Sequence, residues 1–238
     1  MTTPPPGVVN FRDAGGHATP DGVMATGRLF RSANLMNLAD PHGLAPYGIA
    51  TVVDLRNDEE RLDHPTRLHP AMTIVDITID PGSWRQPGQG LPRLDDLYAE
   101  MVEHWAGRLV EAVDAVARHS AEPLLVHCTG GKDRTGMVIA LIQGLLGVAD
   151  DVIAAHYAES GEHLLAAWLA SPPPNVTGGT DWQEFVDSGL LASPPEIMFD
   201  VLGRLRREHD SVEGFLAAHA LDPLAVTRLR THLICIAA

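Results

Sequence analysis

The chain has 238 residues, of which 45% are hydrophobic, so it is long enough and apolar enough to bury a core in one α/β unit with a helical extension. Its 31 acidic and 17 basic residues give a formal net charge of -14, which argues against partners that are polyanions: nucleic acid and anionic membrane surfaces.

Neither targeting nor anchoring is indicated by the sequence. Residues 1–7 contain three consecutive prolines and lack the charged-then-apolar pattern of a secretory signal. The longest apolar stretch, residues 137–149, is shorter than the ~18 residues that a membrane span needs, so no stable membrane association is expected. Two cysteines, Cys128 and Cys235, are too few for a disulfide framework, and a reducing cytoplasm suits a working thiol. We therefore expect a cytoplasmic protein.

Apolar runs rich in β-branched residues predict strands at residues 50–55, 72–79 and 123–127. Stretches of helical period separate them, and residues 94–119 predict one long amphipathic helix. This alternation is typical of an α/β fold with a mostly parallel central sheet flanked by helices. Residues 80–92 and 171–180, rich in proline and glycine, predict loops.

Beyond residue 147 the pattern changes to consecutive helices, predicted at residues 151–169, 195–209, 211–220 and 223–234. We expect a single domain over residues 8–238. It would consist of an α/β core at residues 8–147 and a C-terminal helical cap region at residues 148–238 that packs on the core.

The most informative segment is residues 124–136, which read LLVHCTGGKDRTG. An apolar strand ends at a cysteine, a glycine-containing turn follows, and an apolar helix begins near Arg134. Phosphoryl transfer needs an in-line nucleophile and a dense set of positive donors around the phosphoryl oxygens. A loop at residues 127–136 supplies both, with Cys128 as the nucleophile.

Residues 129–134 are expected to curl around an anion, so that the backbone N–H groups of Thr129, Gly130, Gly131, Lys132, Asp133 and Arg134 converge on it. The two glycines permit the unusual dihedral angles of such a nest, and the positive end of the helix dipole points at the same place. These fields favour thiolate over thiol at Cys128. The guanidinium of Arg134 is expected to hold two phosphate oxygens at once.

Other interpretations of the segment are weaker. An inert buried thiol at Cys128 needs neither the glycines nor the arginine that follow it. A Walker-type nucleotide loop would place its first glycine at Val126 and a serine or threonine at Asp133, so the segment does not predict ATP binding.

The segment resembles the Cys-x5-Arg signature of the protein tyrosine phosphatase superfamily, in the version found in bacterial tyrosine/serine (dual-specificity-like) protein phosphatases. The resemblance extends to residues 10–16 (NFRDAGG), 29–32 (LFRS), 53–56 (VDLR) and the final helices. It implies a phosphatase fold and hydrolysis of phosphate monoesters through a phosphocysteine intermediate. It also implies that His127 orients the thiolate, that the Thr135 hydroxyl assists it, and that neither a metal nor another cofactor takes part.

The leaving oxygen needs a proton, and two aspartates compete to supply it. Asp80 ends a predicted strand and opens a loop that could carry an acid over bound substrate, or it is only a turn residue. Asp133 lies inside the phosphate loop and could donate directly, orient Lys132, or brace Arg134. We favour Asp80.

The expected partners are phosphorylated proteins or phosphorylated small-molecule or lipid substrates. Phosphotyrosine comes first, and phosphoserine, phosphothreonine and phosphoinositides are further candidates. Lys132 could read a second anionic group on the substrate or only add charge to the nest. The alternative from a different class is a non-catalytic phosphate-binding module. Asp54 and Arg56, and likewise Arg12 and Asp13, are expected to be framework ion pairs.

Overall fold

A computed structural model of the chain describes residues 3–82, 91–170 and 181–236. Its centre is a five-stranded sheet in the order β1-β4-β7-β5-β6. The strands are β1 (Arg12–Asp13), β4 (Leu29–Ser32), β5 (Thr51–Asp54), β6 (Thr73–Asp76) and β7 (Leu124–His127). Strands β4, β7, β5 and β6 run parallel, and β1 lies antiparallel to β4. The prediction of an α/β fold with a mostly parallel central sheet is confirmed.

The predicted strands differ from the observed ones mainly at β4 and β6. Strands β5 and β7 lie within residues 50–55 and 123–127, whereas β6 ends at Asp76 instead of continuing to residue 79. Strand β4 lies inside the sheet between β1 and β7, and the apolar pattern did not predict it because Arg31 and Ser32 occupy half of its four positions. All four of its residues are nevertheless buried.

The two faces of the sheet are covered differently. Helices α3 (Ala106–His119) and α4 (Asp133–Leu145) pack on one face, against side chains such as Leu29 and Val126. On the other face, Phe30, Val52 and Leu125 join a smaller apolar cluster with the N-terminal segment and residues around the 3-10 helix η1 (Ala45–Tyr47). Burial of strands on both faces is the usual state of a parallel sheet.

The single helix expected over residues 94–119 is wrong: two helices, α2 (Leu94–His104) and α3, meet at Trp105. The backbone of Trp105 has φ -118° and ψ 11°, which is not helical. Its N–H donates to the carbonyl of Met101, and its carbonyl accepts from the N–H of Arg108, so the residue ends one helix and begins the next. Both helices bury an apolar stripe, so the spacing of apolar residues continues across Trp105 and predicted one helix instead of two.

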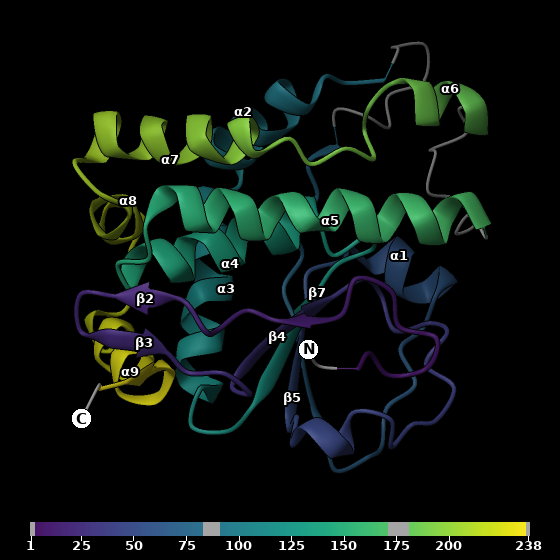
Figure 1. Cartoon of the computed structure of the whole chain (residues 1–238), viewed down its shortest axis with the longest axis horizontal. Helices are drawn as coiled ribbons and strands as arrows, with labels where there is room; N and C mark the ends of the chain where they lie inside the picture. Colours follow the sequence, from purple (N-terminus) through teal and green to yellow (C-terminus); the bar gives the residue numbers. More distant parts are fainter. Residues whose placement is uncertain (1–2, 83–90, 171–180, 237–238) are drawn as a thin grey trace.

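The C-terminal part is helical, as expected. It contains α5 (Asp150–Ala170), α6 (Trp182–Asp187), α7 (Pro195–His209), α8 (Val212–Ala218) and α9 (Pro223–Leu233). The side chains of Ser211 and Asp222 cap the first turns of α8 and α9. In Figure 1, α5 and α7 lie side by side on the same side of the sheet as α4, and the two helices are in contact. The sequence did not predict α6.

The C-terminus returns to the N-terminal half of the chain. Helix α9 packs against α3, and β8 (Ile234–Cys235) pairs with β3 (Gly22–Met24), which pairs with β2 (Ala18–Thr19) (Figure 1).

The division into a core at residues 8–147 and a cap region at 148–238 stays a prediction. Most of the loop predicted at 80–92 and all of the loop at 171–180 lie outside the described residues. Within the described ranges, no helix is both long and apolar enough to cross a bilayer.

Candidate active site

The phosphate-loop segment lies at the carboxyl end of the parallel strands. His127 ends β7 and is in register with Ser32 of β4 and Asp54 of β5. Cys128 follows directly, and α4 begins five residues later at Asp133. The chain therefore places the thiol between the strand ends and the positive end of a thirteen-residue helix. The Cys128 side chain is buried, with 2% of the residue exposed.

Gly131 shapes the turn around the sulfur. Its N–H donates to Cys128 Sγ at 3.2 Å. Its φ of +65° lies in the left-handed region, and a Cβ atom there would stand 2.1 Å from the carbonyl oxygen of Ser32. Only glycine fits both the angle and the close approach to β4, so this position is fixed by the geometry of the loop.

Arg134 is held by a residue that the sequence did not predict for the site. Its Nη1 and Nη2 atoms lie 2.7 and 2.8 Å from the two carboxylate oxygens of Glu60, on helix α1 (Asp58–Asp63). The hydroxyl of Thr129 donates to the same carboxylate. Burial by itself raises the pKa of Glu60, but the hydrogen bonds and charge of Arg134 outweigh it and hold that pKa well below its usual range.

Glu60 is positioned by the start of its own helix. Asn57 caps α1 by accepting the N–H of Glu60 at 2.8 Å, while its own N–H donates to the Glu60 carboxylate at 2.9 Å. This reciprocal arrangement is a capping box. The spacing Asn57-x-x-Glu60 is the signal in the sequence that could have located the helix start, although it carries no information about Arg134.

Asp80 lies beside this group. Its Oδ2 atom accepts a hydrogen bond from Asn57 Nδ2 at 3.0 Å. Burial lowers the pKa of Arg134, but the hydrogen bonds and charge of Glu60 outweigh it and raise that pKa, with smaller contributions from the charges of Cys128 and Asp80. The structure thus brings the preferred acid to the same edge of the sheet as Cys128 and Arg134.

Asp133, the competing acid, is held from two directions. The Tyr98 hydroxyl donates to its Oδ1 atom at 3.0 Å, and Lys132 Nζ lies 3.2 Å from the same atom. Burial and then the charge of Asp133 raise the pKa of Tyr98 well above its usual range, so Tyr98 is a neutral donor at every physiological pH. These contacts hold the Asp133 carboxylate at the start of α4, and the choice between Asp80 and Asp133 as proton donor stays a prediction.

Lys132 does not point into open space. Only 2% of the residue is exposed, and Nζ donates to the carbonyls of Leu190 and Ala192 at 2.5 and 2.8 Å. The ammonium therefore joins the phosphate loop to the segment that follows α6.

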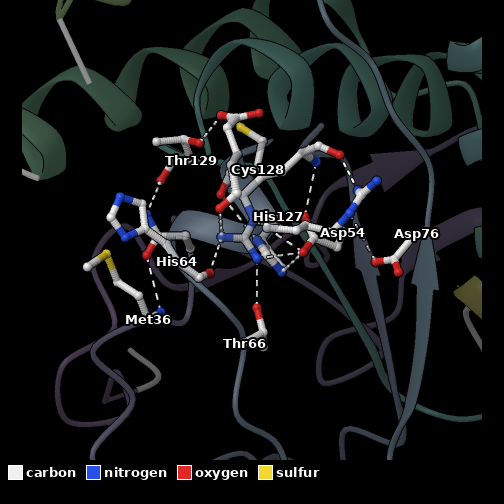
Figure 2. A network of polar contacts seen from close by, with 12 residues as sticks. Met36, Asp54, His64, Thr66, Asp76, His127, Cys128 and Thr129 are labelled. Atoms are coloured by element: carbon white, nitrogen blue, oxygen red, sulfur yellow. Dashed lines mark hydrogen bonds and ion pairs between the residues drawn. The ribbon is translucent and has the colours of Figure 1, made fainter. Parts of the chain in front are cut away.

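Beneath the loop lies a buried polar network that Figure 2 shows from close by. His127 Nδ1 lies 3.1 Å from the carbonyl oxygen of Cys128, and its Nε2 lies 3.7 Å from Asp54 Oδ2. Burial lowers the pKa of His127, so the ring is neutral at neutral pH. Asp54 is paired with Arg56 at 2.7 Å, and both residues are buried, in keeping with the expectation of a framework ion pair. Thr135 is fully buried, and its hydroxyl has no hydrogen-bond partner among the described residues.

Metal ligands are not gathered anywhere in the described ranges: no three or more His, Cys, Asp or Glu side chains there are arranged to hold an ion. The expectation of metal-free chemistry stays a prediction.

The chain is similar to several known proteins. A Cupriavidus necator protein assigned as a tyrosine-protein phosphatase is 34% identical over 168 residues, which span 65% of this chain and 61% of that protein. The triple specificity protein phosphatase PtpB of Mycobacterium tuberculosis is 30% identical over 96% of this chain and 98% of its own length. The crystal structure of P. aeruginosa TpbA has a TM-score of 0.43 and 15% identity, covering 86% of this chain and 95% of that one. The model of the tyrosine phosphatase family matches residues 3–235, and the chain belongs to that family.

Proposed function

We propose that the chain hydrolyses phosphate monoesters, phosphotyrosine first, through a phosphocysteine intermediate at Cys128. The observation that carries this is the pairing of a sulfur that accepts a loop N–H with an arginine whose two terminal nitrogens are held parallel by Glu60. Membership of the tyrosine phosphatase family supports the same activity.

In the first step, the Cys128 thiolate attacks phosphorus, an S–P bond forms, and the P–O bond to the leaving oxygen breaks. Asp80, as a carboxylic acid, gives its proton to that oxygen. In the second step, Asp80 as carboxylate takes a proton from water, the water oxygen attacks phosphorus, and the S–P bond breaks. Arg134 and the amides of residues 129–134 stabilise the charge on the three equatorial oxygens in both steps.

The proposed substrates extend beyond phosphotyrosine to phosphoserine, phosphothreonine and phosphoinositides. The triple specificity named for the M. tuberculosis relative supports this breadth. Lys132 is proposed to bind a second anionic group of the substrate. Its ammonium would then have to break its hydrogen bonds to the carbonyls of Leu190 and Ala192. A reducing cytoplasm is the proposed setting, because it keeps a reactive thiol unoxidised.

The test compares wild type, Cys128→Ser and Cys235→Ser on an aryl phosphate, phosphopeptides and phosphoinositides. Wild type and Cys235→Ser are expected to hydrolyse the same substrates, and Cys128→Ser none. Acid quenching during turnover should trap one phosphate on the peptide that contains Cys128. A wild-type protein that binds phosphate but hydrolyses none of these substrates would instead be a phosphate-binding module.

A further inference from the structure

The carbonyl groups of the phosphate loop are held from outside by side chains of the N-terminal segment. The carbonyl oxygen of Thr129 accepts from the backbone N–H and the Nδ2 atom of Asn34, at 3.0 and 3.1 Å. The carbonyl oxygens of Gly130 and Gly131 both accept from Asn10 Nδ2, each at 3.0 Å. Three consecutive loop carbonyls are thus fixed on the side away from the site.

This outward hold determines where the loop N–H groups point. A trans peptide is planar, and its C=O and N–H project in opposite directions. The peptide between Gly130 and Gly131 presents its carbonyl to Asn10 and its N–H to Cys128 Sγ. A side chain that fixes this carbonyl therefore also aims the N–H at the sulfur.

Asn10 is itself held in an unusual conformation. Its φ of 58° lies in the left-handed region, which asparagine tolerates better than most residues. Only 4% of the residue is exposed. Arg12 Nη1 donates to its Oδ1 atom and, at 3.3 Å, to its carbonyl oxygen. Because arginine only donates, this contact assigns Oδ1 to Arg12 and leaves Nδ2 for the loop.

Arg31 adds a buried charge at the same place. Its Nη2 atom donates to the carbonyl of Gly131 at 2.8 Å and to Ser160 Oγ at 3.2 Å, and only 1% of the residue is exposed. Among the residues that the structure describes, no carboxylate lies within ion-pair distance of its guanidinium. Burial lowers the pKa of Arg31 to about 10, and the charge of Cys128 is one of the influences that oppose this lowering.

We propose that Asn10 and Arg31 are positioning residues that favour the Cys128 thiolate, Asn10 by aiming the Gly130–Gly131 N–H at the sulfur and Arg31 by fixing the Gly131 carbonyl and supplying positive charge behind the loop. Among the described residues, Arg31 on β4 and Arg134 on α4 are cations whose pKa values are raised by the charge of Cys128. The inference rests on the proposed use of Cys128 as nucleophile.

The experiment measures the rate of Cys128 alkylation by iodoacetamide as a function of pH, with no substrate present, in Asn10→Gly, Arg31→Met and Arg31→Lys. Glycine keeps the positive φ of position 10, and lysine keeps the charge of position 31 but not its fork. The matched control is Arg28→Met, because Arg28 also donates to two backbone carbonyls, those of Ser120 and Ala121, at the other end of β4. Turnover of an aryl phosphate and thermal unfolding are measured in parallel.

Asn10→Gly and Arg31→Met are expected to move the alkylation midpoint to higher pH by about one unit and to lower kcat about tenfold, less than the ~100-fold typical of removing a direct oxyanion donor. Arg31→Lys should fall between Arg31→Met and wild type, and Arg28→Met should alkylate like wild type. If the first two variants unfold at lower temperature but keep the wild-type alkylation profile, both residues are merely structural and the inference is overturned.

Alkylation is read without turnover, so it also separates this inference from the proposed function. A wild-type protein that does not hydrolyse any phosphate ester would contradict the proposed function, while the alkylation profiles would still decide what Asn10 and Arg31 do. If Arg31→Met does not fold, the alkylation profiles of Asn10→Gly and Arg31→Lys still test the inference.

Discussion

Glu60 and Arg134 form a two-point ion pair, with nitrogen–oxygen distances of 2.7 and 2.8 Å, between residues that are 74 positions apart in the chain. The pair joins the first turn of α1 to the first turn of α4. Because a planar guanidinium held by two parallel contacts cannot rotate freely, Glu60 presets the plane in which Arg134 meets a phosphoryl group.

Glu60→Gln is expected to lower kcat/KM by about tenfold or more, because an amide offers Arg134 one acceptor instead of two and carries no charge. The variant should also unfold more easily, since removal of one partner from a buried pair typically costs about 3 to 5 kcal/mol. Steady-state kinetics and urea unfolding at neutral pH measure both effects. Glu213→Gln, at an exposed position in the first turn of α8, is the comparison variant. Equal kinetics in Glu60→Gln and wild type would contradict the role.

The same carboxylate predicts a pH dependence. The pKa of Glu60 in the folded protein is lowered from its ordinary value of 4.5, so the folded state binds fewer protons than the unfolded chain. The stability that Glu60 contributes is therefore complete above pH 4.5 and is lost as pH falls below that value toward the folded-state pKa. The difference in unfolding free energy between wild type and Glu60→Gln should be constant from about pH 7 to pH 5.5 and shrink at lower pH. A difference that stays constant to about pH 3 would show that the charge is not responsible.

Asp80→Asn and Asp133→Asn should respond differently to the leaving group. A poor leaving group needs a proton as the P–O bond breaks, and an activated nitrophenolate does not. Asp80→Asn is therefore expected to lose turnover strongly on phenyl phosphate and little on p-nitrophenyl phosphate. Asp133→Asn, which loses the anionic acceptor of Tyr98 and Lys132, should lose a similar factor on both. The reverse pattern would assign the proton to Asp133, and equal losses in Asp80→Asn would refute its role.

The two loop glycines are expected to differ in their tolerance of alanine. A Cβ on Gly131 would stand 2.1 Å from the backbone oxygen of Ser32, in a conformation that alanine disfavours. A Cβ on Gly130 would lie 3.2 Å from the outer edge of the Trp168 ring, a side-chain contact that a shift of a few tenths of an ångström relieves. Gly131→Ala should abolish turnover and vanadate binding, whereas Gly130→Ala should keep most of both. Comparable activity in the two variants would contradict this geometry.

His156 should make the fold sensitive to mild acid. Burial, followed by the nearby charges of Arg31 and Arg12, lowers the pKa of His156 well below 6.5. Near pH 6.5 His156 is protonated in the unfolded chain but stays neutral in the folded protein. The free energy of unfolding therefore falls as pH decreases through that range. His156→Gln should lose less stability between about pH 7.5 and pH 5.5 than wild type does. His42→Gln, at an exposed position, should follow wild type. Identical slopes in all three proteins would refute this assignment.

The local part of the site could be predicted from sequence, and the distant part could not. Cys128, Gly131 and Arg134 belong to one strand–loop–helix segment, so their proximity follows from chain connectivity. Glu60 lies close to Arg134 because β5 and β7 are paired in the sheet. No periodicity in the sequence predicts that contact. The capping spacing at Asn57 indicates a helix start but not what the carboxylate binds.

The fold shows the same division. The apolar runs identified β5 and β7 because both strands are short, mostly apolar and buried. Strand β4 was missed because a buried arginine breaks the apolar pattern, and that arginine is accommodated by a carbonyl from Gly131, 100 residues away. The break at Trp105 was missed because apolar spacing continues across it, while the backbone turns to keep both helices on the core.

Lys132 is the only lysine in the chain, and its ammonium is enclosed by the carbonyls of Leu190 and Ala192. Amine acylation of the intact protein therefore has a single side-chain target. Mass spectrometry would count one acyl group on the peptide that carries Lys132 whenever that ammonium leaves its two carbonyls, with the α-amino group resolved on a separate peptide. Acylation of this one residue would therefore measure how often the loop that contains Lys132 separates from the segment after α6.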